Sequence, residues 1–216
     1  GAAIAVPLSA PREGRLISCS HGNRRVERTE HNGSITVLAD SYEGKRLNSP
    51  NDVVVKSDGT LWFTDPPYGI ISDHEGIRAE SEIGNNQVYR FDPATGDLSV
   101  VADDFDRPNG LAFSPDESEL YIADSGYARG HGFGFEEGHP RHVRAFKVVD
   151  GRKLTGSRVL AVIEPKVPDG LRVDTEGLLW ISAGDGIHCY TPLGQRLGRI
   201  LVPETVANLT FGGFGK

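Results

Sequence analysis

Three stretches of this chain decide its fold: SPNDVVVKSDGTLWFTDPP (49–67), RPNGLAFSPDESELYIADSG (107–126) and VPDGLRVDTEGLLWISAGD (167–185). In each stretch the second residue is proline, and Asn or Asp follows it. A short apolar run, an acidic turn and a second apolar run come next. Two apolar runs of strand length around a tight turn are typical of an antiparallel hairpin. The sequence therefore predicts the same hairpin three times.

The repeat extends beyond these hairpins. The second apolar run has a further copy, GRLISCSHG (14–22), and the four copies begin 45, 59 and 59 residues apart. Two more β-rich segments around a glycine-containing turn follow each copy, as in QVYRFDPATGDLSVVAD (87–103). Units of four strands that recur every 40–60 residues indicate a β-propeller. We therefore predict an all-β fold, with no helical periodicity in any segment.

The repeat also suggests how the chain is divided. We predict one incomplete propeller domain over residues 1–216, with blade units at about 1–41, 47–103, 106–164 and 167–203 and the start of the next blade at 206–216. Four blades and a fraction would leave a ring open, with exposed sheet edges. We therefore expect further blade sequence outside this chain. The chain has no methionine and begins without a signal-peptide pattern, and both a cytoplasmic and a periplasmic location fit it.

The composition narrows the classes of binding partner that the chain can have. The formal net charge of −7 argues against nucleic acid and against an anionic membrane surface, which both select basic proteins. No apolar run approaches the ~20 residues needed to span a bilayer. Cys19 and Cys189 stand alone, without zinc or disulfide spacing, so we expect packed thiols. The composition predicts no oligomeric state.

The polar residues before the hairpins predict a site. Asn51, Asn109 and Asp169 lie 58 and 60 residues apart, one blade step each. The first strand of a blade lines the central channel, so side chains in matched register should reach one axial pocket. Oxygen donors of this kind suit a hard cation such as Ca²⁺. Any one Pro-Asn-Gly or Pro-Asp-Gly motif alone is more often a turn, but a turn needs no matching between blades.

The same motifs carry a family resemblance. SPNDVVVKSDGTLWFTDPPYG, RPNGLAFSPDESELYIADS and VPDGLRVDTEGLLWIS resemble the SMP-30/gluconolactonase/luciferin-regenerating-enzyme family, from about residue 14 to residue 212. HGNRRVERTEHNG and GKRLNSPND are closest to its bacterial gluconolactonase branch. The resemblance implies a six-bladed propeller in the complete protein, one divalent cation on its axis, and a sugar lactone as substrate.

The resemblance also implies a role for each matched residue. Asn109 matches a metal-ligand asparagine, and Asp169 matches a ligand aspartate that is also proposed as the general base. Asn51 matches an asparagine that touches the substrate or a metal-bound water. A ligand glutamate of the family's first blade has no counterpart here, which fits a missing blade. Ca²⁺ is the preferred cation, with Zn²⁺ and Mg²⁺ as alternatives.

Other polar residues have both a functional and a structural interpretation. His21, in SHGNRR, faces the pocket and shuttles a proton or binds substrate, or else hydrogen-bonds to loop backbone. Tyr68, in DPPYG, contacts the sugar or only completes a rigid turn. Arg24 and Arg25 are expected to be a solvated pair.

These residues predict a metal-dependent lactonase. The cation would polarise the lactone carbonyl, and Asp169 would deprotonate the attacking water. Two alternatives stay open: a non-enzymatic interaction propeller with a structural metal, and a strictosidine-synthase or paraoxonase type of propeller with a different substrate. The chain has no G-x-S-x-G motif, which disfavours a serine hydrolase.

Overall fold

The computed structural model describes residues 2–5 and 14–212. These residues form four antiparallel sheets of four strands each and one two-stranded ribbon. The helical content is a single turn, α1 (Tyr68–Ile71). The prediction of an all-β, propeller-type fold is therefore confirmed.

Each sheet is built from consecutive strands. The first contains β1 (Ala2–Ala5), β2 (Leu16–Ser20), β3 (Arg25–Thr29) and β4 (Ile35–Ala39), followed by the ribbon of β5 (Ser41–Tyr42) and β6 (Lys45–Arg46). The second contains β7 (Val53–Val55), β8 (Leu61–Asp65), β9 (Asn86–Asp92) and β10 (Asp97–Phe105). The third contains β11 (Pro108–Phe113), β12 (Glu119–Asp124), β13 (His142–Val149) and β14 (Lys153–Val162). The fourth contains β15 (Leu171–Val173), β16 (Leu179–Ala183), β17 (Gly186–Tyr190) and β18 (Arg196–Leu201).

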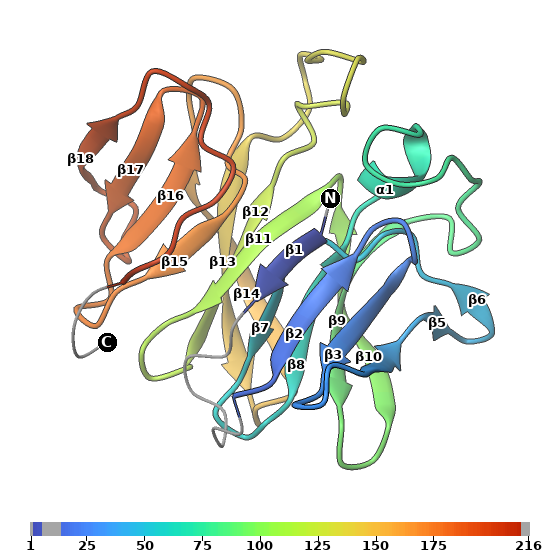
Figure 1. Ribbon diagram of the computed structural model, residues 1–216. Helices are drawn as coiled ribbons and strands as arrows, with labels where there is room; N and C mark the ends of the chain where they lie inside the picture. Colours follow the sequence, from blue (N-terminus) through green and yellow to red (C-terminus); the bar gives the residue numbers. More distant parts are fainter. Residues whose placement is uncertain (1, 6–13, 213–216) are drawn as a thin grey trace.

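The sheets follow one another around a common centre (Figure 1). The first strands of neighbouring sheets lie next to each other, β1 beside β7, β7 beside β11, and β11 beside β15. Because β7 and β8 are antiparallel, as are β11 and β12, the segments that precede β7 and β11 lie at the same end as the segments that follow β8 and β12. Matched registers therefore bring the three Pro-Asn or Pro-Asp motifs to one end of the central strands.

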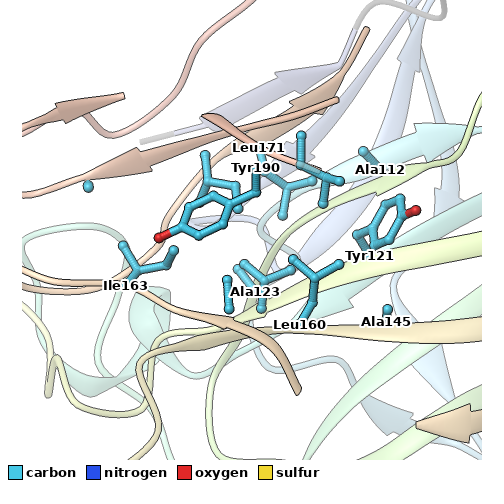
Figure 2. Packing of buried hydrophobic residues seen from close by; sticks show 13 residues of the cluster. Ala112, Tyr121, Ala123, Ala145, Leu160, Ile163, Leu171 and Tyr190 are labelled. Atoms are coloured by element: carbon cyan, nitrogen blue, oxygen red, sulfur yellow. The ribbon is translucent and has the colours of Figure 1, made fainter. Parts of the chain in front are cut away.

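Apolar side chains fill the space between sheets rather than within one sheet. One cluster lies between the third and fourth sheets and includes Tyr121, Leu160, Leu171 and Tyr190 (Figure 2). Another joins the second and third sheets, where the Trp62 ring meets Phe113 edge to face at 5.5 Å. Trp62 therefore packs between blades. This interdigitation fixes the position of each first strand relative to the next.

An aspartate at the end of the second strand holds the segment that leads into the first strand. In the second sheet, Asp65 accepts hydrogen bonds from the backbone N–H groups of Asn48 and Ser49, at 2.8 and 2.7 Å. In the third sheet, Asp124 accepts the N–H groups of Asp106 and Arg107 in the same way, at 3.1 and 2.9 Å. These carboxylates fix the loops that carry Asn51 and Asn109.

The expectation of a solvated Arg24–Arg25 pair is wrong for Arg24. Its side chain is buried, and Nε donates to the carbonyl oxygens of Leu47 and Asn48 at 2.7 and 3.1 Å. Arg24 has a left-handed backbone, φ 57°, which turns its side chain under the neighbouring loop. Arg25 is half-buried and pairs with Glu27 at 2.6 Å. Neighbouring positions in a turn point in different directions, which the sequence pattern did not reveal.

Candidate metal and substrate site

Backbone hydrogen bonds tie the three predicted site segments together. Asn51 N donates to Thr64 O at 2.9 Å, and the Thr64 hydroxyl donates to Asn109 O at 2.8 Å. Gly110 N donates to Asp169 O at 3.0 Å. A continuous path of short contacts therefore leads from Asn51 through Asn109 to Asp169, across three sheets.

Gly110 permits the last of these contacts. A Cβ atom at this position would lie 2.2 Å from Asp169 O and 2.9 Å from the Gly170 Cα. Both are backbone atoms, which cannot rotate away. Glycine is required here by close approach of two strands, and it places Asn109 directly beside Asp169.

The side chains of Asn109 and Asp169 interact. Asn109 is buried, its Nδ2 donates to Ser125 Oγ at 3.2 Å, and a side-chain hydrogen bond links it to Asp169. The Ser125 hydroxyl in turn donates to Pro168 O, and Ser182 Oγ accepts Asp169 N at 3.1 Å. Serines at the ends of two second strands thus orient both predicted ligands.

The electrostatics around Asp169 fit a cation. Burial raises the pKa of Asp169 to about 7, and the negative charges of Asp52 and Glu75 add to this rise, while the hydrogen bond from Asn109 opposes it. Excess negative charge in a buried pocket is stabilised by a bound cation, and amide and carboxylate oxygens are ligands that Ca²⁺ accepts. Within residues 2–5 and 14–212, no three His, Cys, Asp or Glu side chains form a metal cluster, so the fit rests on Asn51 and Asn109 beside one carboxylate.

Sequence reasoning missed an ion pair at the centre. Asp52 is buried, accepts Leu111 N at 3.2 Å, and lies 3.6 Å from the Arg172 guanidinium. Burial raises the pKa of Asp52, and Arg172 partly opposes that rise. The pair joins the second sheet to the fourth. A charged residue within the short apolar run Leu171–Val173 was the signal that could have indicated it.

His21 lies beside Asn51. It is buried, and its Nε2 is 3.3 Å from the Asn51 Nδ2, while its Nδ1 is 3.6 Å from Glu75 Oε2. Burial lowers the pKa of His21 to about 4, so the ring is neutral at pH 7. The structure therefore brings His21 to the predicted site and adds Glu75, which no sequence motif had indicated.

Tyr68 lies in a more enclosed position. It begins α1, its hydroxyl donates to Ser125 O at 3.3 Å, and the Arg107 guanidinium lies 5.3 Å from its ring centre. Its side chain is buried, and burial raises its pKa. Tyr68 thus packs against the serine that supports Asn109, and substrate contact stays a prediction.

A separate cavity of about 580 Å³ lies beyond α1, lined by Ile70, Ile71, Arg78, Arg107, Arg129 and Phe133 among others. One of its walls is the loop between β12 and β13, which rises beside α1 in Figure 1. Gly130 of this loop packs on Ile71, and His131 stacks on His74 with ring centres 3.5 Å apart. Asn51, Asn109 and Asp169 do not line this cavity.

Comparison with known proteins places this arrangement in a family. Residues 3–216 match the model of the "SMP-30/Gluconolactonase/LRE-like region". The chain belongs to this family. The predicted resemblance is therefore confirmed. Within the part of the chain that the structure describes, no helix is long and apolar enough to cross a membrane.

Individual members of the family give the detail. A gluconolactonase of Zymomonas mobilis is 32% identical over 217 residues, covering 94% of this chain and 56% of the relative. A solved gluconolactonase of Xanthomonas campestris is 40% identical, with a TM-score of 0.82 over 93% of this chain and 62% of that protein. The calcium-binding protein regucalcin of Agrobacterium tumefaciens shares the fold, with a TM-score of 0.67 at 21% identity, over 93% of this chain and 61% of that protein.

The chain spans about half the length of the curated relatives that it matches.

Proposed function

We propose that this chain carries the catalytic pocket of a metal-dependent hydrolase that opens a sugar lactone. The observation that carries the proposal is the contact between Asn109 and Asp169, which Gly110 permits and on which the negative charges of Asp52 and Glu75 act. The similarity to gluconolactonases supports a lactone as substrate.

Asn109 and Asp169 would hold a divalent cation, Ca²⁺ by preference, and Asn51 would complete the polar wall directly or through water. When bound, the cation supplies Lewis-acid polarisation of the lactone carbonyl. Asn51 would hydrogen-bond a sugar hydroxyl group, and His21, whose two ring nitrogens face Glu75 and Asn51, would act on the substrate through Asn51. Tyr68, whose hydroxyl donates to Ser125 O, would lie at the edge of the same pocket.

Asp169 would also accept a proton from the attacking water on a carboxylate oxygen. Its pKa of about 7 suits a base that operates near neutral pH. Coordination of the same carboxylate to a cation would lower that pKa, so its ligand role and its base role oppose each other. Among Asn51, Asn109 and Asp169, only Asp169 is ionisable, and lactone hydrolysis requires a proton acceptor.

The first experiment measures hydrolysis of δ-gluconolactone with and without EDTA. We expect activity that EDTA removes and Ca²⁺ restores. An interaction propeller would show no hydrolysis, and a propeller of strictosidine-synthase or paraoxonase type would prefer other substrates; either result would refute the proposal.

Two variants separate the roles of Asp169. In Asn109→Ala, a metal ligand is lost but no base, so excess Ca²⁺ should restore most of kcat. In Asp169→Asn, we expect kcat to stay about 10²-fold lower even at saturating Ca²⁺, because an amide accepts no proton. Full recovery of Asp169→Asn would assign the base elsewhere, with His21 as the next candidate.

A further inference from the structure

Three polar groups form a chain that ends at the proposed site. Glu75 Oε2 lies 3.6 Å from His21 Nδ1, and His21 Nε2 lies 3.3 Å from Asn51 Nδ2. His21 is buried, and its Nδ1 has no hydrogen-bond partner in the described part of the chain. The structure places the Glu75 carboxylate against this nitrogen.

A neutral imidazole carries one proton, on either Nδ1 or Nε2. A carboxylate close to Nδ1 attracts a proton-bearing Nδ1–H group and repels the lone pair that an unprotonated Nδ1 would carry, so it favours the Nδ1–H tautomer. With the proton on Nδ1, Nε2 is an acceptor, and it can then bind only the NH₂ group of Asn51. The other end of the Asn51 amide, the oxygen, is left for the pocket. With the proton on Nε2, the amide would rotate and turn its NH₂ group into the pocket instead.

We propose that Glu75 is a positioning residue that sets the tautomer of His21 and thereby directs the Asn51 side-chain oxygen into the pocket. The inference rests on the proposed function only for what the Asn51 side chain binds. An amide oxygen binds a cation or a hydroxyl donor, whereas an NH₂ group repels a cation. The contacts among Glu75, His21 and Asn51 involve residues of this chain alone.

The fold holds Glu75 in this position. The segment around it folds back on α1, where Ile77 N donates to Gly69 O at 3.0 Å and Ala79 N donates to Ile70 O at 2.9 Å. A Cβ atom on Gly76 would lie 2.1 Å from Gly69 O. The Glu75 loop is thus packed against α1 with no spare room.

The other side of α1 rests on His21. A Cβ atom on Gly69 would lie 2.7 Å from the Cβ atoms of both His21 and Ser49, and Gly69 N donates to Ser49 Oγ at 2.9 Å. The single turn α1 therefore fixes the loop that carries Glu75 relative to the imidazole ring of His21.

The test is the tautomer of His21 in the purified, calcium-free protein, measured by ¹⁵N–¹H long-range correlation spectra of ¹⁵N-histidine-labelled samples. The His21 signals are assigned by their absence from a His21→Gln spectrum. We expect the Nδ1–H form in the wild type, and a mixture or the Nε2–H form in Glu75→Leu, which has no charge or acceptor. Glu75→Gln, whose side-chain oxygen can still accept, should lie closer to the wild type. Glu80→Leu, an exposed carboxylate on the same loop, should leave the spectrum unchanged.

The second measurement is Ca²⁺ affinity by calorimetry. Mutation of residues that orient a metal ligand without touching the metal changes metal affinity by about 10–100-fold. Glu75→Leu should therefore bind Ca²⁺ about tenfold more weakly than the wild type, and the affinity of Glu75→Gln should lie between the two. An Nε2–H tautomer in the wild type, or the same tautomer in Glu75→Leu, would overturn the inference.

The two proposals fail in different ways. If His21 changes tautomer in Glu75→Leu while the wild type neither binds Ca²⁺ nor hydrolyses lactones, the positioning role stands and the proposed function falls. If the wild type is a Ca²⁺-dependent lactonase whose His21 carries its proton on Nε2, the function stands and the role of Glu75 falls.

Discussion

Replacement of Gly110 by alanine tests the close packing that builds the site. The new Cβ would lie 2.2 Å from Asp169 O, 2.9 Å from the Gly170 Cα and 3.0 Å from Leu171 N. Ordinary contacts are 3.4 Å or more, so the backbones of β11 and the segment before β15 must separate by about 1 Å. Such overpacking costs about 1–3 kcal/mol, and weakening the hydrogen bond from Gly110 N to Asp169 O adds about 0.5–1.5 kcal/mol. We expect a loss of about 1.5–4.5 kcal/mol in the free energy of unfolding.

Urea unfolding followed by circular dichroism measures this loss, and Gly198→Ala is the matched control. Gly198 also lies in a strand, β18, but a Cβ there would meet nothing within 4 Å. Its alanine variant should be unchanged or more stable by about 0.5 kcal/mol. If Gly110→Ala proved as stable as Gly198→Ala, the contact between β11 and Asp169 would not be as tight as described. Ca²⁺ affinity should fall together with stability, because the same movement separates Asn109 from Asp169.

Three further substitutions test the fold. Burial raises the pKa of Asp65 to about 7, above the value of about 3.9 expected for an unfolded chain; the folded state therefore holds the extra proton between these values. As the pH rises through this window, the free energy of unfolding should fall by about 1.4 kcal/mol per pH unit. Asp65→Asn should remove that slope in urea titrations at several pH values; equal slopes in the wild type and the variant would contradict the assignment. Asp124→Ala leaves the backbone N–H groups that it accepts without a partner, and we expect a loss of about 2–4 kcal/mol in thermal or urea unfolding. Leu171→Ala empties a fully buried position between two sheets and should cost about 2–5 kcal/mol, whereas the control Leu193→Ala, 91% exposed, should stay within about 0.5 kcal/mol of the wild type.

The order of the sheets and the three motifs could be predicted because they repeat. A strand with side chains alternating between faces produces a local pattern, and a turn needs Gly, Asn or Asp at a fixed place. Asn51, Asn109 and Asp169 were found because the same local pattern recurs at one blade step. The family resemblance relied on the same three segments.

Residues without a counterpart in other blades could not be found in this way. Glu75 lies in a loop whose sequence shows no periodicity, and it reaches His21 only because α1 folds back on the first sheet. Charge alone predicts exposure for Arg24. Its buried position depends on the carbonyl groups of Leu47 and Asn48, more than twenty residues further along the chain.

The repeating four-stranded unit, the all-β class and the polar residues before three first strands are local properties, since each follows from periodicity and turn chemistry. The charges that act on Asp169, the pairing of Asp52 with Arg172 and the approach of Glu75 to His21 arise only when the sheets pack together. Contacts of this kind join residues from different sheets, and their distances depend on how neighbouring sheets pack. Packing acts on the whole set of side chains at once, so no single segment of sequence contains it.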